Sequence, residues 1–238
     1  FEKFKMDTLF TNSLGMKNIL DLAVKYKAKI VHGSTSVVYG PRTKDKKKFN
    51  EEDFGVINHL SERGCYDEGK RFAETCVETY RQVHGLDVRI ARIFRTYGPR
   101  QRLYDGEMVP DFITDAIDGK DLVIYGDQTF KTSLTYVSDI VDGLVKLMAH
   151  SGDYLGPVNL GSDQDASLVE VAERIIKMTN SGSKIVFVDP LLFMTSLGLP
   201  DIRKAKEELG WFPLVRLEDG LKKSVEYALA KKQLLGLK

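Results

Sequence analysis

Residues 29–40 read Lys-Ile-Val-His-Gly-Ser-Thr-Ser-Val-Val-Tyr-Gly, an apolar run that ends in small hydroxyl residues. This run predicts a short strand. Apolar residues at helical spacing predict helices over about 7–26 and about 65–84 on either side of it. Residues 88–94 form the next expected strand, with alternating character. Helices that alternate with strands in this way are typical of a parallel, doubly wound α/β sheet.

The pattern changes after residue 100. Helices are expected near 107–118, 138–149, 168–179, 201–209 and 217–231, and short strands near 122–125, 132–137, 157–160 and 184–188. Short strands mixed with helices are typical of a smaller α+β lobe. We therefore expect one domain in residues 1–100 and a second in residues 101–238, with some later segments returning to the first.

Charge and cysteine content narrow the class of protein. The 238 residues carry 35 Lys and Arg against 34 Asp and Glu, so the net charge of +1 argues against a protein that mainly coats nucleic acid or an anionic membrane. No apolar run approaches the roughly 18 residues of a membrane helix. Two cysteines without CxxC spacing exclude a disulfide framework and a zinc knuckle, and predict a reducing, cytoplasmic location. No metal site is expected.

The strongest local feature is Tyr66-Asp-Glu-Gly-Lys70. On a helix, residues four apart lie on one face, so the lysine ammonium would lie beside the phenol. A positive neighbour lowers the pKa of a tyrosine, which can then take a proton from a substrate hydroxyl and return it. The same spacing recurs at Tyr227-Ala-Leu-Ala-Lys231, where no hydroxyl-rich strand precedes it. We interpret that second copy as structural.

Context separates the two copies. Ser34 and Thr35 end the predicted parallel strand, and ligands of open α/β sheets bind outside such strand ends. Hydroxyl residues at a strand end more often satisfy their own backbone. The combination of Thr35 with Tyr66 and Lys70 favours a catalytic site instead.

The phosphate-binding fingerprint of dinucleotide sites is absent from the 238 residues. Neither a G-x-x-G-x-x-G nor a P-loop occurs, and the chain opens on Phe1 within a helical pattern. We therefore expect that an N-terminal, glycine-rich part of the protein precedes Phe1.

Several stretches together carry a family resemblance. They are Asn12-Ser-Leu-Gly-Met-Lys-Asn18, Ser34-Thr-Ser-Val-Val-Tyr-Gly40, Tyr66-Asp-Glu-Gly-Lys70, Arg92-Ile-Phe-Arg-Thr-Tyr-Gly-Pro-Arg100, Tyr136-Val-Ser-Asp139 and Pro200-Asp-Ile with Leu209-Gly-Trp211. The chain resembles the extended short-chain dehydrogenase/reductase family, which contains the NAD-dependent epimerases, dehydratases and decarboxylases of nucleotide sugars. Among its subfamilies the chain is most similar to UDP-glucuronate decarboxylases. The resemblance implies the C-terminal part of an NAD-binding Rossmann domain, followed by a nucleotide-sugar-binding lobe.

The resemblance also implies roles for particular residues. Tyr66 would be the acid/base, Lys70 would tune its pKa and anchor the ribose, and Thr35 would be the hydroxyl partner. The residues implied to contact NAD are Asn12, Ser34, Tyr66, Lys70 and Thr96. Those implied to contact a UDP-sugar are Thr35, Arg95, Arg100 and Val109. A homodimer joined through the Tyr66 helix is expected by the same resemblance.

Two departures affect the expected reaction. Val37 stands where the decarboxylases carry a glutamate, and Leu199 stands where they carry a basic residue. An apolar residue at position 37 is closer to the 4-epimerases. In the nucleotide site, the family's asparagine and two arginines are replaced by Arg95, Glu107 and Thr132.

Three hypotheses therefore stand. The first is an NAD-dependent decarboxylase of UDP-glucuronate that forms UDP-xylose through a 4-keto intermediate. The second is a UDP- or dTDP-sugar 4-epimerase or dehydratase of the same family. The third is a non-catalytic relative that acts as a binding or partner subunit.

Overall fold

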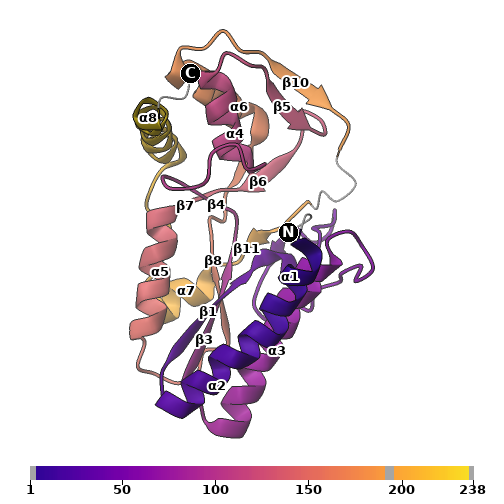
Figure 1. Ribbon diagram of the computed structural model, residues 1–238, viewed down its shortest axis with the longest axis vertical. Helices are drawn as coiled ribbons and strands as arrows, with labels where there is room; N and C mark the ends of the chain where they lie inside the picture. Colours follow the sequence, from indigo (N-terminus) through magenta and orange to yellow (C-terminus); the bar gives the residue numbers. More distant parts are fainter. Residues whose placement is uncertain (1–3, 191–195, 236–238) are drawn as a thin grey trace. The chain divides into compact units, whose positions relative to one another are not determined.

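The computed structural model describes residues 4–190 and 196–235, except for the side chain of residue 235 (Figure 1). Contacts divide the chain into two units. The first takes Phe1–Phe94, Val141–Asp163 and Thr195–Phe212, and the second takes Arg95–Ile140, Gln164–Met194 and Pro213–Lys238. The functional roles expected for residues 1–100 and 101–238 stay predictions.

A three-stranded parallel sheet forms the centre of the first unit. Its order is β1 (Ile30–Thr35), β3 (Val88–Ile93), β8 (Pro157–Leu160). Ser34 of β1 pairs with Arg92 of β3, which pairs with Asn159 of β8, so these three residues form one row across the sheet. Because the strands alternate with helices and run parallel, the predicted α/β fold class is confirmed.

Helices cover both faces of this sheet. On one face lie α1 (Lys5–Phe10), α2 (Met16–Tyr26) and α3 (Gly64–His84) (Figure 1). Ile90 points to this side and packs with Leu20 of α2 and Val77 of α3. On the other face lies α5 (Val137–Ala149), where Gly143 approaches Leu160 so closely that a Cβ would lie 2.9 Å from it.

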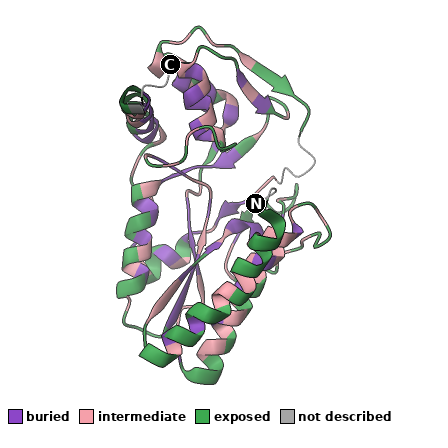
Figure 2. Cartoon of the chain, in the orientation of Figure 1, coloured by how far each residue is buried: buried purple, intermediate pink, exposed green. Residues whose placement is uncertain are grey.

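The expected alternation of strand 88–94 is wrong, because the structure buries consecutive residues of β3. Ile90 is 2% exposed and its neighbour Ala91 is 0% exposed. A parallel strand with helices on both faces has no solvent-facing side, so every position is apolar or hydrogen-bonded. Figure 2 shows this burial along the central strands, with exposed residues on the outer sides of α1 and α2.

The helix expected over 7–26 begins at Lys5 and ends at Tyr26, but it is not a regular α-helix throughout. A π-helical segment, η2 (Thr11–Gly15), separates α1 from α2. The Asn12 amide and the Ser13 hydroxyl donate to the carbonyl oxygens of Thr8 and Leu9, each at 2.8 Å. Side chains that bond to the preceding turn compete with the backbone ladder, which accounts for the widened turn.

Several short elements complete the first unit. A 3₁₀ turn, η3 (Ser36–Tyr39), follows β1 directly. Strand β2 (Lys48–Phe49) pairs in parallel with β11 (Leu199–Pro200), and α7 (Arg203–Leu209) follows. The stretch between η3 and α3 therefore contains one short strand.

The second unit packs three helices on one another around a core that includes Val109, Ile175 and Leu221. These helices are α4 (Met108–Ile117), α6 (Leu168–Thr179) and α8 (Leu217–Leu235). Its strands form pairs: β4 (Thr96–Tyr97) with β7 (Thr135–Tyr136), β5 (Leu122–Tyr125) with β10 (Ile185–Val188), and β6 (Lys131–Ser133) with β9 (Asp165–Ser167).

The continuous strand expected over 132–137 is wrong. Strand β6 ends at Ser133, β7 covers Thr135 and Tyr136, and α5 begins at Val137. The two strands have different partners, because β6 pairs antiparallel with β9 while β7 pairs parallel with β4. A change of partner at Leu134 breaks the strand, and the local sequence alone does not reveal it.

Candidate active site

Helix α3 carries the predicted Tyr66 and Lys70, and it brings Lys70 against β1. Lys70 lies one turn after Tyr66, and its Nζ donates to the carbonyl oxygen of Gly33 at 3.2 Å. Gly33 lies on β1, two residues before Thr35. The lysine ammonium is therefore held against the strand that carries the predicted hydroxyl partner.

Burial lowers the pKa of Lys70 below its ordinary value, because desolvation disfavours the charged form. The same low dielectric strengthens the interaction of an ammonium with any negative oxygen placed beside it. The Lys70 ammonium would therefore attract a phenolate or a ribose hydroxyl at this position more strongly than it would in water. The Tyr66 ring itself is half-buried, with the Arg63 guanidinium 5.9 Å from its centre.

Thr35 caps the turn that follows it. Its Oγ1 accepts a hydrogen bond from the backbone N–H of Val37 at 3.4 Å, at the start of η3. A hydroxyl has two acceptor lone pairs and one donor hydrogen, so this cap leaves the O–H hydrogen unused. The structural role that hydroxyl residues often take at a strand end is present here, and it is compatible with a second role toward a ligand.

Ser34 is buried on β1, with its side chain turned toward α3. Its Oγ donates to Glu74 Oε1 of α3 at 2.5 Å. The predicted contact of Ser34 with NAD stays a prediction, and the hydroxyl itself is already bonded within the protein.

Asn12 lies in the π-helical segment against α3, close to the predicted catalytic pair. A Cβ on Gly69 would lie 3.2 Å from the Asn12 Cβ. Gly69 is the residue between Glu68 and Lys70 on α3, and it allows the two helices to approach each other this closely. A glycine inside a helical pattern was the available sequence signal for this contact.

The remaining predicted residues belong to the second unit. Thr96 pairs with Thr135 between β4 and β7, and the Arg95 carbonyl accepts from the Thr135 N–H at 3.0 Å. Arg100 has a left-handed backbone with a φ of 71°. Val109 is buried, and its side chain belongs to the hydrophobic core of this unit.

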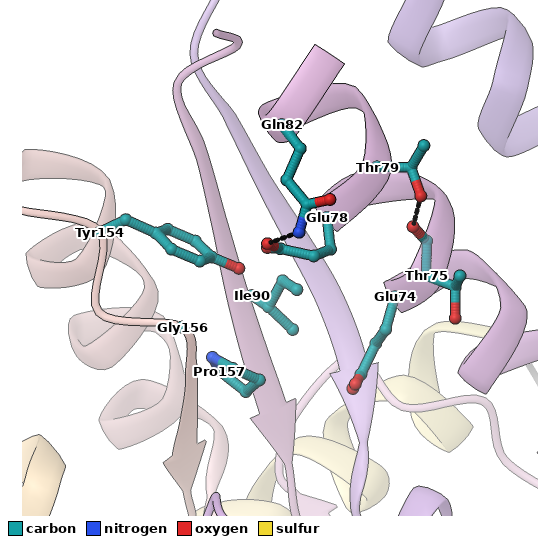
Figure 3. Close-up of a pocket in the computed structure, with 9 residues that line it drawn as sticks. All are labelled: Glu74, Thr75, Glu78, Thr79, Gln82, Ile90, Tyr154, Gly156 and Pro157. Atoms are coloured by element: carbon teal, nitrogen blue, oxygen red, sulfur yellow. Dashed lines mark hydrogen bonds between the residues drawn. The ribbon is translucent and has the colours of Figure 1, made fainter. Parts of the chain in front are cut away.

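A pocket of about 540 Å³ beside α3 lies apart from these residues (Figure 3). Its lining comprises Glu74, Thr75, Glu78, Thr79, Gln82, Ile90, Tyr154, Gly156 and Pro157. Hydrogen bonds from Arg81 lower the pKa of the Glu78 carboxyl to about 2, and Gln82 also donates to it at 2.7 Å. Because this carboxylate already has protein partners and no predicted site residue lines the pocket, we do not place the active site here.

Two absences apply to residues 4–190 and 196–235. No helix there combines the length and apolar character that a membrane crossing requires. No group of three or more His, Cys, Asp or Glu side chains in those ranges is arranged to hold a metal ion.

Comparison with known proteins places the chain in a family. The family model described as "NAD dependent epimerase/dehydratase family" matches residues 2–161. UDP-glucuronic acid decarboxylase 1 of Xenopus tropicalis is 43% identical over 220 residues, which is 92% of this chain and 51% of that protein. UDP-glucuronic acid decarboxylase 5 of Arabidopsis thaliana is 43% identical over 214 residues, which is 90% of this chain and 62% of that protein. The chain thus spans between about half and three fifths of these two relatives.

Solved structures agree with the sequence comparison. UDP-glucose 4-epimerase of Thermotoga maritima, solved with UDP-glucose, matches with a TM-score of 0.85 at 27% identity, over 95% of this chain and 71% of that chain. UDP-glucuronic acid 4-epimerase of Bacillus cereus, solved with UDP-glucuronic acid and NAD, matches with a TM-score of 0.83 at 27% identity, over 94% of this chain and 68% of that chain. Taken with the α3–β1 geometry, these matches show that the chain belongs to the NAD-dependent epimerase/dehydratase family.

Proposed function

We propose that this chain is part of an NAD-dependent nucleotide-sugar enzyme that works through a 4-keto intermediate and most resembles a UDP-glucuronate decarboxylase. The observation that carries the proposal is the bond from Lys70 to the Gly33 carbonyl, which brings the Tyr-x-x-x-Lys face of α3 to the end of β1. The relatives at 43% identity that are named UDP-glucuronic acid decarboxylases support the choice of substrate.

The residues present fit the ribose end of NAD. Lys70 offers ammonium N–H donors at the end of β1, of which the Gly33 carbonyl takes one. A bound NAD would supply the acceptor, and later the donor, for the hydride at C4 of the sugar. The glycine-rich loop that holds the phosphates of such a cofactor is not among the 238 residues.

Three side chains handle the proton in this proposal. Tyr66 takes the proton of the C4 hydroxyl, the charge of Lys70 stabilises the resulting phenolate, and Thr35 holds the sugar oxygen through its hydroxyl. A 4-keto uronic acid then loses CO₂, because the ketone accepts the electron pair that the carboxylate leaves behind. Tyr66 returns its proton when the ketone is reduced again.

A specific observation favours the 4-epimerase as the second candidate. Val37 and Leu199, which stand where the decarboxylases carry an acidic and a basic residue, are 5% and 7% exposed. Neither apolar side chain can deliver the proton that must replace the lost carboxylate. A 4-epimerase has no such requirement, because it only removes and returns hydrogen at C4.

Product analysis decides between the candidates. The protein expressed from its complete gene is incubated with NAD and UDP-glucuronate, and the products are followed by ¹H NMR. The decarboxylase predicts CO₂ and a UDP-pentose, whereas the 4-epimerase predicts UDP-galacturonate, or inversion of a UDP- or dTDP-hexose supplied instead. If no sugar reacts and no NAD co-purifies with the protein, the catalytic proposal is wrong and the non-catalytic hypothesis takes its place.

We also propose a homodimer in a cytoplasmic location. Large apolar side chains are exposed on the helices beside the candidate site, including Phe10 at 47%, Leu14 at 59% and Phe72 at 52%. Exposed apolar side chains gathered on neighbouring helices are typical of a surface that binds a partner. The location rests on Cys65 and Cys76, which are both free thiols.

A further inference from the structure

A network of buried polar side chains lies beside the candidate site, and the reaction proposed above does not use it. Glu74 of α3 is at its centre. Its carboxylate accepts from the Ser34 hydroxyl at 2.5 Å, and from Arg92 Nε and Nη2 at 3.0 and 2.8 Å. The side chains of Glu74 and Arg92 are each 12% exposed. One carboxylate therefore ties α3 to both β1 and β3.

The spacing along α3 relates this network to the catalytic residues. Tyr66, Lys70 and Glu74 follow one another at intervals of four residues, so they lie along one face of the helix. Lys70 bonds to Gly33, and Glu74 bonds to Ser34, the next residue of β1. Two successive turns of α3 are thus fixed to two successive residues of β1, immediately before Thr35.

The arginine extends the network to the other side of Thr35. Arg92 Nη1 donates to the Tyr39 hydroxyl at 2.9 Å, and the guanidinium lies 4.8 Å from the centre of that ring. The Tyr39 hydroxyl in turn donates to Asn159 Oδ1 at 2.8 Å. Tyr39 ends the turn η3 that begins directly after Thr35. The network therefore holds the residue before Thr35 and the last residue of the turn that follows it.

The sheet register explains why these groups meet. Ser34, Arg92 and Asn159 form one row across β1, β3 and β8, so their side chains leave the sheet on the same face, toward α3. A buried ion pair adds little net stability, because its desolvation opposes its attraction. A bidentate guanidinium–carboxylate pair does restrict geometry, since two parallel hydrogen bonds allow one orientation.

We propose that Glu74 is a positioning residue of the candidate active site: through Ser34 and Arg92 it sets the register of α3 on β1, so that Tyr66 and Lys70 meet Thr35 in reactive geometry. This inference rests on the proposed function, because it assigns the network a purpose only if α3 carries the acid/base. Glu74 itself touches neither substrate nor cofactor in this account.

The charged groups around Glu74 determine how the local electrostatic potential changes when its carboxylate is removed. Arg92 on β3 pairs with it directly, Lys70 lies one turn earlier on α3, and the Glu51 carboxylate bonds to the Asn159 N–H at 2.8 Å. His32 on β1 is buried, and burial followed by the charge of Lys70 lowers its pKa to about 4. His32 is therefore neutral near pH 7 and does not replace a missing charge.

The test is the variant Glu74→Gln in the protein expressed from its complete gene, assayed by turnover of the nucleotide sugar over a range of pH. The loss of the carboxylate leaves the Arg92 charge uncompensated at a position two turns of α3 from Tyr66. The acid limb of kcat/KM, which reports deprotonation of Tyr66, should move to lower pH by about one unit. The altered register of α3 should lower kcat by about tenfold or more, with a smaller change in KM.

Glu78→Gln is the matched control, because Glu78 lies one turn further along α3 and bonds to Arg81 and Gln82 rather than to the sheet. It should leave kcat and the acid limb as in the wild type. Arg92→Lys keeps the charge but loses the bidentate geometry, so it should lower kcat without moving the acid limb.

The outcomes are distinguishable. If the wild type turns over no nucleotide sugar, the proposed function is wrong, and this inference is wrong with it. If the wild type is active and Glu74→Gln matches Glu78→Gln in kcat and acid limb, only the positioning role is wrong, even when Glu74→Gln melts at a lower temperature. If Glu74→Gln does not fold, Arg92→Lys decides, and a wild-type kcat in that variant overturns the proposal.

Discussion

The contact between Gly69 and Asn12 shows how a single residue shapes the candidate site. Gly69 precedes Lys70, and its missing side chain lets the π-helical segment approach α3. A glycine inside a helix costs about 0.5–1 kcal/mol relative to alanine. At Gly69 this loss of stability accompanies a closer approach of the two helices, which brings Asn12 beside the Tyr-x-x-x-Lys segment of α3.

Gly69→Ala should therefore fail to give the stabilisation that a helical Gly→Ala change usually brings. The new methyl group would lie 3.2 Å from the Asn12 Cβ. This Cβ is attached directly to the backbone, so it cannot move aside as the end of a flexible side chain can. We expect a net loss of about 1 kcal/mol in the free energy of unfolding, together with a lower kcat. Urea unfolding and steady-state turnover measure the two effects.

Gly15→Ala is the control for this change. A Cβ there would meet its nearest neighbour, the Phe10 carbonyl oxygen, at an ordinary 3.7 Å. Gly15→Ala should leave stability unchanged or raise it. Equal effects of the two alanines on stability and on kcat would show that the approach at Gly69 has no importance.

At the residue scale, the sequence predicts which side chains share a helix face but not which partners they bond to. The spacing of Tyr66 and Lys70 follows from helix geometry, and it correctly predicts that they share a face of α3. The bonds of Ser34 and Arg92 to Glu74 depend on the register between β1 and β3. That register is a tertiary property, so no local pattern indicated that Glu74 bonds to both strands.

Among the elements, the start of α4 carries an electrostatic conflict. Asp111 lies in its first turn, where the helix dipole favours a negative charge. Burial, and then the carboxylate of Asp115, nevertheless raise the pKa of Asp111 from 3.8 to about 6. Desolvation and like charges therefore outweigh the helix dipole at this position.

Asp111→Asn should stabilise the protein near neutral pH. A raised pKa means that the folded protein holds this proton more tightly than the unfolded chain, so Asp111 destabilises the fold as the pH rises from 3.8 through about 6. After discounting for solvent screening, we expect a gain of about 1 kcal/mol at pH 7.5 and none below the lower value. Urea unfolding of both proteins at pH 7.5 and below pH 3.8 measures the difference in the free energy of unfolding.

Asp127→Asn serves as the opposite case, since hydrogen bonds from Thr129 lower the pKa of Asp127. Its replacement should not stabilise the protein at pH 7.5. A gain from Asp127→Asn, or a pH-independent effect of Asp111→Asn, would contradict the electrostatic explanation.

Element boundaries were predictable where local signals were strong. The helix expected over about 65–84 is Gly64–His84, because its apolar positions are periodic and Gly85 ends it with a left-handed φ of 63°. The strand expected over 132–137 is broken, because its two halves pair with different strands. The π-helical segment was also missed, since its cause is a pair of side-chain bonds that periodicity does not show.

For the whole molecule, the exposed apolar side chains predict self-association. Phe10→Glu combined with Phe72→Glu places charges on α1 and α3, where the two aromatic rings are half exposed. A dimer formed through these helices should dissociate, because burying a carboxylate in an apolar interface is costly. Light scattering after size-exclusion chromatography should show a dimeric wild type and a monomeric variant.

Leu214→Glu is the control, because Leu214 is 71% exposed but lies in the second unit, away from these helices in the chain. It should leave the dimer intact. A monomeric wild type, or a double variant that stays dimeric, would exclude this interface.

The identity and order of the family motifs were readable across the whole molecule, because they are local stretches of sequence. The sequence predicts the reaction less clearly. Val37 and Leu199 lack the acidic and basic groups that would specify decarboxylation. Both hypotheses for the reaction nevertheless require the same phenol to move the same proton.

The central claim is therefore tested most directly by turnover of UDP-glucuronate in Tyr66→Phe beside Tyr227→Phe, measured by ¹H NMR with the protein expressed from its complete gene. Both tyrosines stand four residues before a lysine, but only Tyr66 lies on the helix that Lys70 fixes to β1. The proposed mechanism predicts that Tyr66→Phe loses about 10²- to 10⁴-fold in kcat while its fold stays intact, and that Tyr227→Phe keeps wild-type turnover. Wild-type turnover in a folded Tyr66→Phe variant would contradict it.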